Sequence, residues 1–297
     1  TVMRHLLRPN AALVCRRQMV RGRACNFFWI ADDLVLDGYV RSDNRGSESV
    51  FPLLLADDAD SDSVAKANFS TEFLQACERT LNARYTLQPT DDGTALGPYE
   101  LLHYVYALIH SPEYRRRYAE SLYHDFPRIL LPGSWPLFQS LAKLGEELIT
   151  LHLLKEAHTS PQRKQGKLDA PPALARRASV VGDDSREVVV ATGFPKFQAG
   201  SIAISSEASF SGIDQADWNF KVGSHQVLYK WLKDRRKQTL TTEDLATYRQ
   251  LCHAVRRTRT IVTMIDQTIE NAGGWPAAFT GSSTNATDFK LGGRSSC

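Results

Sequence analysis

The sequence predicts an α+β fold, with mixed short strands, a helical subdomain and a long C-terminal helix. Short apolar and alternating runs open the chain, amphipathic helical patterns fill its centre, and a strand pair precedes two further helices. Strands and helices therefore come in blocks, which favours α+β over an alternating parallel-sheet fold. A hydrophobic content of 42% over 297 residues is enough to build a core.

Residues 1–95 are predicted to form a strand-rich first part. Its expected strands are three short runs bounded by polar turns: AALV (11–14), FFWI (27–30) and LVLDGYV (34–40). A helix should then run from an N-cap at Ser70 to about Arg84, with Phe69 and Leu74 placed for a hydrophobic staple. Residues 88–98 read as a loop.

Residues 96–156 are predicted to be helical. PYELLHYVYALIH is apolar nearly all round, so its helix should be buried. Ser111 and Pro112 have the residue types of an N-cap and a first helical position, so a new helix should begin there. Leucines at alternating spacings of four and three mark the core-facing stripe of the next helix: Leu137, Leu141, Leu144, Leu148 and Leu151.

The second half of the chain contains a predicted break, a strand pair and two helices. Residues 157–182 lack periodicity and are rich in Pro, Ala, Arg, Lys and Gln, so they read as a flexible insertion. In the part 183–275, REVVVATGF (186–194) and GSIAIS (200–205) predict strands, and helices are expected at about 224–237 and 242–271, the second about 40 Å long. Residues 276–297 are expected to be a disordered tail.

No catalytic motif occurs in the chain. It lacks a phosphate-cradling G-x-x-x-x-G-K-[ST] loop, a G-x-G-x-x-G turn, H-E-x-x-H and a G-x-S-x-G elbow. His103 and His110, seven residues apart on the apolar helix, fit core positions better than metal ligands, and no Cys/His spacing typical of zinc is present. Asp183, Asp184 and Glu187 lie close together as a metal nuclease would require, but such acidic clusters commonly occur by chance. We therefore expect no catalytic residue, metal or cofactor in this chain, which disfavours a stand-alone enzyme.

The cysteines and the apolar runs bear on location. Five scattered cysteines without a C-x-x-C pair predict free thiols in a reducing cytoplasm. No apolar run approaches the length needed to cross a bilayer, so we expect no membrane association. The chain begins with Thr1, and we expect it to be a piece of a longer polypeptide.

Charge is unevenly distributed although the formal net charge is only +3. Residues 1–30 carry six arginines and no acid, and residues 221–237 carry six basic residues and one acid. Local basic clusters can mark anion-binding surfaces, and they can equally be solvated faces. On a helical wheel for the segment that begins at Tyr114, Arg115 falls in the packed arc, while Arg116 and Arg117 fall on the wet face with Glu120 as an i,i+4 partner of Arg116.

Two long blocks carry a resemblance to a known family. They are PYELLHYVYALIHSPEYRRRYAESLYHDFPRILLP (98–132) and WNFKVGSHQVLYKWLKDRRKQTLTTEDLATYRQL (218–251), with a looser match at VFPLLL (50–55). These blocks resemble the C-terminal specificity, or target recognition, region of single-chain type ISP and type IIG restriction–modification enzymes. The resemblance covers most of residues 1–270. It departs from the family at His225, where the family has an aromatic residue after Gly-Gly.

The resemblance implies a domain that binds double-stranded DNA and presents a target adenine to an adenine-N6 methyltransferase domain, in cis or in trans. That catalytic domain would lie before Thr1 and would use S-adenosylmethionine. Gln226 and His225 are then the expected base readers, because Gln can bond adenine bidentately. The expected phosphate contacts are basic side chains: Lys221, Lys230, Lys233, Arg235 and Arg236, with Arg116 and Arg117 as optional additions. The alternative is a helical protein–protein interaction module that uses its tyrosines as anchors.

Overall fold

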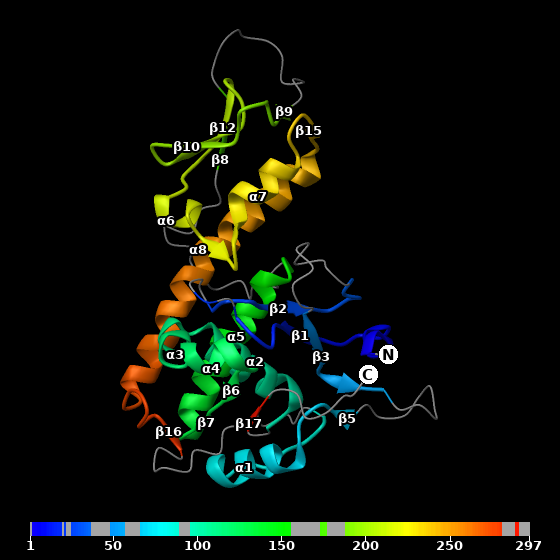
Figure 1. The fold of residues 1–297 in the computed structure, drawn as a ribbon, viewed down its shortest axis with the longest axis vertical. Coiled ribbons are helices and arrows are strands. Elements are labelled where there is room, and N and C mark those ends of the chain that lie inside the picture. The colour runs from blue at the N-terminus through cyan, green and yellow to red at the C-terminus, as the bar shows by residue number, and fades with distance from the viewer. Residues whose placement is uncertain are drawn as a thin grey trace. The chain divides into compact units, whose positions relative to one another are not determined.

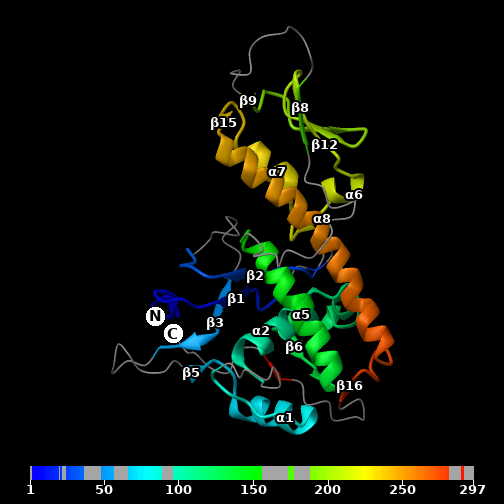
Figure 2. The same ribbon diagram turned by 180° about the vertical axis from the view of Figure 1, so that it is seen from behind.

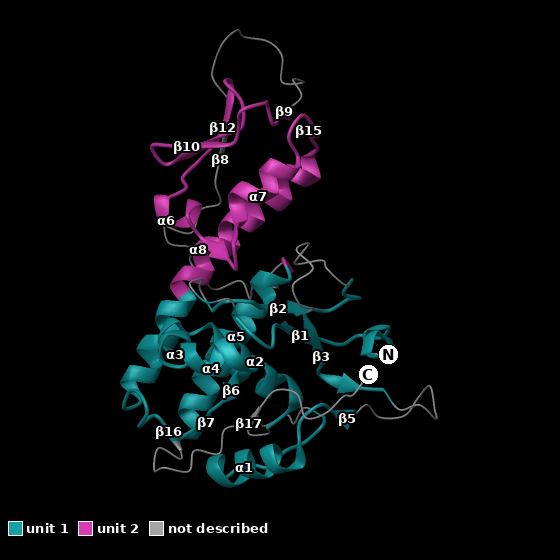
Figure 3. Cartoon of the chain, viewed as in Figure 1, with its two compact units in different colours: residues 1–153, 261–297 teal, residues 154–260 magenta. Residues whose placement is uncertain are grey.

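The computed structural model describes residues 2–19, 21, 25–36, 48–56, 66–88, 96–155, 173–176, 188–280 and 289–290. The chain divides into two compact units, coloured separately in Figure 3: Thr1–Leu153 with Ile261–Cys297 (unit 1), and Leu154–Thr260 (unit 2). Each unit has its own hydrophobic core. Helices and short antiparallel strands occur in both (Figures 1 and 2), which confirms the α+β class.

Unit 1 opens with a 3-10 helix, Val2–Leu6, and a three-stranded antiparallel sheet in the order β2-β1-β3. The central strand β1 (Ala12–Cys15) is buried along its whole length between β2 (Phe28–Ala31) and β3 (Ser49–Pro52). A shorter pair, β4 (Leu54–Leu55) with β5 (Lys66–Ala67), follows. The strands predicted at 11–14 and 27–30 are therefore confirmed.

The strand predicted at 34–40 is wrong where the structure describes it. Residues 34–36 are not a strand, and residues 37–40 lie outside the described residues. The backbone N–H of Leu34 donates to Asp33 Oδ1 at 2.6 Å, a local turn that ends the preceding strand. Leu34 and Leu36 are 49% and 72% exposed, so this alternating run covers no core.

Helix α1 (Thr71–Leu81) begins as the sequence predicts, because Ser70 Oγ accepts the backbone N–H of Phe73 at 3.2 Å. It ends three residues before the predicted Arg84, since Asn82 adopts a left-handed conformation with φ 49°. Phe69 and Leu74 both pack against the core, and the Phe69 ring stacks on Phe73 with centroids 5.6 Å apart.

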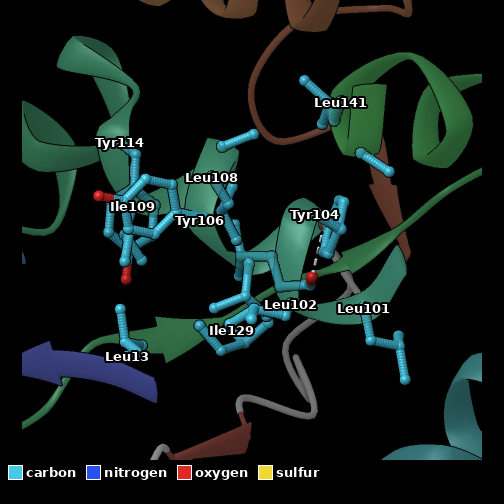
Figure 4. Close-up of a cluster of buried hydrophobic side chains, with 14 of the residues drawn as sticks. Leu13, Leu101, Leu102, Tyr104, Tyr106, Leu108, Ile109, Tyr114, Ile129 and Leu141 are labelled. Atoms are coloured by element: carbon cyan, nitrogen blue, oxygen red, sulfur yellow. Dashed lines mark hydrogen bonds between the residues drawn. The ribbon is translucent and has the colours of Figure 1, made fainter. Parts of the chain in front are cut away.

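The centre of unit 1 is the pair of helices α2 (Pro98–His110) and α5 (Trp135–His152). The burial predicted for α2 is confirmed, and Figure 4 shows Tyr104, Tyr106 and the leucines of α2 in the core with Ile129 and Leu141. Gly145 of α5 lies against α2 so closely that a Cβ there would be 1.8 Å from the His103 carbonyl oxygen. Only glycine fits this crossing without moving a helix.

The segment 96–156 is less uniformly helical than predicted. After α3 (Pro112–Arg117) and α4 (Ala119–His124) come two short strands, β6 (Arg128–Ile129) and β7 (Leu131–Pro132). Buried tyrosine hydroxyls hold this stretch, because Tyr114 donates to the Arg128 carbonyl and Tyr104 to the Leu130 carbonyl, each at 2.7 Å. Non-local pairing of this kind leaves no helical or alternating signature in the sequence.

The C-terminal residues also depart from the prediction of a disordered tail. Strand β16 (Phe279–Thr280) pairs with β7, and β17 (Phe289–Lys290) pairs with β6. Phe279 is buried, so pairing and burial together order this part. Residues 281–288 and 291–297 lie outside the described residues.

Unit 2 is built on a four-stranded antiparallel sheet in the order β10-β11-β12-β8. Its strands are β10 (Lys196–Gln198), β11 (Ser201–Ala203), β12 (Ala208–Ser211) and β8 (Ala173–Arg176). Strand β8 falls inside 157–182, for which no secondary structure was expected; the rest of that segment lies outside the described residues. Within the predicted strand at 186–194, residues 188–194 contain β9 (Val188–Val189), which pairs with β15 (Thr239–Leu240), and a turn with Gly193 at φ 87° follows; residues 186–187 lie outside the described residues.

Helix α8 (Thr242–Asn271) has the bounds that the sequence predicts. It stops before Gly273 and Gly274, whose positive φ values of 112° and 72° suit only glycine. In unit 2 it supplies Tyr248, Cys252 and Val255 to the core, and in unit 1 it supplies Ile261, Ile265 and Ile269. This three- and four-residue spacing is the pattern of a core-facing helical stripe.

Three histidines lie in or beside the core of unit 1. His110 Nδ1 donates to the Tyr106 carbonyl at 2.8 Å, and the Tyr106 hydroxyl bonds His152 Nδ1 at 2.7 Å. Burial lowers the pKa of His103 and of His152 to about 4, and burial, with the neighbouring His152 and Arg115, holds the pKa of His110 well below 6.5. These imidazoles are therefore core groups, as the sequence predicts for His103 and His110.

The buried histidines predict loss of stability in mild acid. Below its unfolded pKa near 6.5, such an imidazole binds a proton in the unfolded chain but not in the folded one, because its folded pKa is lowered. The free energy of unfolding is therefore highest above about pH 6.5 and falls as the pH drops toward the folded pKa of about 4. The free energy of unfolding should therefore fall between pH 7 and pH 5, by up to about 2 kcal/mol per histidine. Urea denaturation across this range measures it. His152→Gln should flatten the curve, and an equally steep curve in this variant would contradict the assignment.

Candidate nucleic-acid interface

The basic cluster predicted at 221–237 lies in unit 2 on a hairpin followed by a helix. The short helix α6 (Gln215–Trp218) leads into β13 (Lys221–Val222) and β14 (His225–Gln226), and α7 (Val227–Asp234) follows directly. The hairpin turns over Gly223 and Ser224, and Gly223 has φ 59°. Glycine at the first position of a two-residue loop is typical of a tight β-hairpin turn.

His225 and Gln226 are therefore strand residues, which corrects the helix predicted from 224 to 237. Their paired backbone groups in β13–β14 keep the chain extended until Val227. The helix also ends early, because Arg235 leaves the helical conformation and Lys237 has φ 64°. The helix packs through Leu228 and Leu232, which are buried, while Val227 and Trp231 pack against the same core.

The two expected base readers differ in what their side chains do. His225 is exposed on β14. Gln226 is partly buried, and its Nε2 donates to the Trp218 carbonyl at 2.5 Å. That bond closes the base of the hairpin, so the Gln226 amide already has a structural partner.

Arg235 and Arg236, expected as phosphate contacts, are both partly buried and bonded within unit 2. The Arg235 guanidinium lies 3.6 Å from the Trp231 ring centroid, and its Nε donates to Asp244 at 3.1 Å. Arg236 Nε donates to the Phe194 carbonyl, and its Nη2 lies 3.3 Å from the Tyr229 hydroxyl. Both arginines thus join α7 to neighbouring segments of the unit.

The lysines of the cluster are more accessible. Lys221, Lys230 and Lys233 are exposed. Lys230 pairs with Asp234 one helical turn away, but both side chains are about half exposed, at 47% and 49%. Exposed ion pairs of this kind contribute little and exchange readily with other anions. Of the basic residues predicted here, these three are the best placed to meet phosphate groups.

Arg116 and Arg117 lie on α3 of unit 1 and share one carboxylate. Glu113 accepts hydrogen bonds from Arg116 Nη2 and Arg117 Nε, each at 2.6 Å, and the Arg116 bond, with help from Arg117, lowers the pKa of Glu113 to about 2. The predicted Arg116–Glu120 pair is wrong, because α3 ends at Arg117 and Glu120 instead lies 3.3 Å from Arg21 Nη2.

Arg115 lies on the packed side of α3, as the wheel predicts. Burial lowers the pKa of its guanidinium to about 10, and the charge of Asp266 on α8 opposes that effect. Asp266 in turn accepts hydrogen bonds from the Ser111 hydroxyl and from the Glu113 backbone N–H. Arg115 therefore belongs to a structural network at the start of α3.

A carboxylate network that the sequence did not reveal holds α6 in place. The Asp217 side chain is 1% exposed and accepts from Arg256 Nε at 3.0 Å and Arg259 Nη1 at 2.5 Å. Arg259 also bonds both oxygens of Asp214, the N-cap of α6, at 3.0 and 3.1 Å. Partners 39 to 45 residues apart in sequence give no local signal.

The sequence also did not identify Lys196 and Gln198 as candidate contacts, although both are exposed polar residues on β10. The sequence places them after the predicted strand 186–194, in a stretch with no assigned structure. A signal was present, since Ala199-Gly200 lies between Phe197 and the apolar run 202–204, and a glycine in a two-residue loop is compatible with a hairpin turn.

Among the residues that the structure describes, no group of three or more His, Cys, Asp or Glu is placed to hold a metal ion. Within the same ranges, no helix combines the length and apolarity that a bilayer crossing requires. Cys15, Cys25, Cys77 and Cys252 are buried free thiols, and burial raises the pKa of Cys15, Cys77 and Cys252 to about 12. Thiols of this kind are structural rather than reactive.

Comparison with known proteins identifies the family. The family described as the Type ISP C-terminal specificity domain matches residues 1–264, so the chain belongs to that family. The fold is similar to part of the DrdV–DNA complex solved by cryo-EM (TM-score 0.53, 18% identity, 88% of this chain and 24% of that one). It is also similar to part of LlaBIII, an ATP-dependent Type ISP restriction–modification enzyme bound to DNA (TM-score 0.54, 15% identity, 88% of this chain and 16% of that one). No curated protein sequence matches significantly.

The chain spans about a quarter or less of the length of these two solved proteins. At identities of 18% and 15% the likeness concerns the fold. It is the family match over 1–264 that defines the class.

Measurements of unfolding free energy can test the assignment of Arg115 to the packed side of α3 and of Arg116 and Arg117 to its exposed side. Arg115→Ala removes the cation near the partly buried Asp266, so the free energy of unfolding should fall by about 2 kcal/mol. Arg116→Ala removes one exposed cation from Glu113, which keeps Arg117, so the change should stay below about 1 kcal/mol. Equal effects of the two variants in chemical denaturation would contradict this assignment.

Arg235 should likewise differ from its neighbour Lys233. Arg235→Ala removes a stacked guanidinium and an ion pair with Asp244, at a cost of about 1–2 kcal/mol in unfolding free energy. Lys233→Ala removes an exposed charge and should change stability by less than about 0.5 kcal/mol. Thermal melts of the two variants at equal protein concentration measure the difference, and a larger loss in Lys233→Ala would overturn it.

Proposed function

We propose that this chain is the DNA target recognition domain of a type ISP or type IIG restriction–modification enzyme. It would bind duplex DNA and present a target adenine to a methyltransferase domain outside this chain. The observation that carries the proposal is the family match to a specificity domain over residues 1–264. Both similar solved structures contain DNA, in the DrdV–DNA complex and in LlaBIII bound to DNA.

The chemistry of unit 2 supports this proposal. Lys221, Lys230 and Lys233 present exposed ammonium groups on and beside a hairpin whose tip carries Ser224 and His225. Lysines neutralise phosphates, and hydroxyl and imidazole groups can bond base edges. The domain would thus supply affinity and sequence choice, while bond chemistry and S-adenosylmethionine belong to the catalytic domain, in cis or in trans.

The alternative, a helical protein–protein module anchored by tyrosines, loses three of its anchors in 98–132, where Tyr99 is 40% exposed and Tyr118 and Tyr123 are partly exposed. Tyr104, Tyr106 and Tyr114 are at most 1% exposed and fill the core of unit 1. Interface anchors must reach the partner surface, and these side chains cannot do so without unfolding the unit.

The proposal predicts salt-dependent binding to duplex DNA. Affinity should fall linearly with salt on a logarithmic scale, with a slope of about −0.9 for each phosphate neutralised. Replacing Lys221, Lys230 and Lys233 together by Ala should reduce the slope by up to about 2.7. Fluorescence anisotropy with a labelled random duplex, between about 50 and 200 mM salt, measures both quantities.

A matched control removes the same charge from unit 1, at three exposed cations that take part in no proposed contact: Lys66, Arg79 and Lys143. Its slope should equal that of the wild type. Absence of DNA binding by the wild-type chain would contradict the proposed function. Equal slopes in the two triple variants would instead move the contact surface away from the lysines of unit 2.

A further inference from the structure

We infer that the β10–β11 hairpin of unit 2 is a base-reading element, and that Gln198 at its tip reads an adenine in the major groove. The inference rests on the proposed function, since it requires that the chain binds DNA. Figures 1 and 2 both show this hairpin protruding from the edge of the unit 2 sheet.

Gln198 is exposed and its side chain is available. Lys196 and Gln198 are exposed at alternate positions of β10, and Phe197 between them faces the other way, onto Trp218. No hydrogen bond joins the Gln198 carboxamide to any residue that the structure describes. Gln226, by contrast, donates its side-chain N–H to the Trp218 carbonyl.

The hairpin is held rigidly at its tip and along its inner face. The turn residues Ala199 and Gly200 both have positive φ, 44° and 78°, as in the tight type I′ turn that suits antiparallel strands. The Gly200 carbonyl accepts the Ile213 backbone N–H at 3.1 Å. The Phe197 ring stacks on Trp218, with centroids 5.9 Å apart and planes 16° apart. Because the backbone of the hairpin is preorganised, the Gln198 side chain can bind a base without a large loss of backbone entropy.

The chemistry of this hairpin fits the major groove. A two-stranded β-ribbon enters that groove, where adenine offers N7 as an acceptor and N6 as a donor, the pair that a carboxamide matches bidentately. β10 is the edge strand of the sheet, so β11 is its one neighbour in that sheet. Lys196, two residues before Gln198 on the same face, is placed to contact a flanking phosphate.

Two aspartates that follow the hairpin in sequence do not oppose an approaching phosphate. Asp217 is buried between Arg256 and Arg259. Asp214 is more exposed, but it pairs with Arg259. Burial opposes the ionisation of Asp214, and hydrogen bonds from the Asp217 backbone N–H and from Arg259 outweigh burial and lower its pKa. Glu207 keeps an exposed carboxylate on the turn between β11 and β12, at the other end of β11 from Ser201, the residue that pairs with Gln198.

The test is a selection of bound sequences from a random duplex pool, with the 297-residue chain, Gln198→Ala and Gln198→Glu. Gln250→Ala, an exposed glutamine on α8, is the matched control. Wild type and control should enrich the same sequence. Gln198→Ala should lose the preference for adenine at one position by about tenfold, with affinity for random duplex within about twofold of wild type. Gln198→Glu should shift that position toward cytosine, whose N4 donates to a carboxylate.

Each other outcome overturns a defined statement. If both Gln198 variants enrich the wild-type sequence at every position, the hairpin assignment is wrong while the proposed function stands. If the affected position prefers a base other than adenine in the wild type, the adenine assignment is wrong. If the wild-type chain binds no duplex, the proposed function fails and this inference fails with it. Melting temperatures equal to wild type exclude unfolding as the cause of any change.

Discussion

One buried carboxylate organises unit 2. Enclosing a carboxylate costs several kcal/mol unless cations and hydrogen bonds surround it, so Asp217 requires both Arg256 and Arg259 on α8. This requirement ties α6 to α8 and thereby fixes Trp218, the last residue of α6. The Trp218 ring supports β10 through Phe197, and its carbonyl supports β14 through Gln226. Both hairpins that carry candidate DNA contacts therefore depend on a charge that neither of them contains.

The parts of the fold that the sequence predicted are those with local causes. Helices α1, α2, α5 and α8 were predicted because core-facing periodicity and capping residues lie within the helix or next to it. The packed position of Arg115 followed from the same periodicity. Strands β1 and β2 were found because short buried runs of Val, Ile and Phe have few other uses.

The parts that the sequence missed depend on distant partners. β8, β16 and β17 exist because each pairs with a strand far away in the chain. Composition also could not show that Arg235, Arg236 and Gln226, predicted as DNA contacts, already bond Asp244, the Phe194 carbonyl and the Trp218 carbonyl. Residue type alone marks a basic region in unit 2, and the tertiary contacts distinguish its bonded side chains from its accessible ones.

Gly145 has a consequence for how the domain can vary. The Gly145 Cα lies so close to the His103 carbonyl that there is no room for a methyl group. Close packing of the two central helices of unit 1 therefore restricts position 145 to glycine. Glycine codons differ only in their third base, so silent drift is the one change that this codon can accept with the helix pair intact. Substitutions that diversify this domain must therefore accumulate elsewhere, at positions that leave this crossing undisturbed.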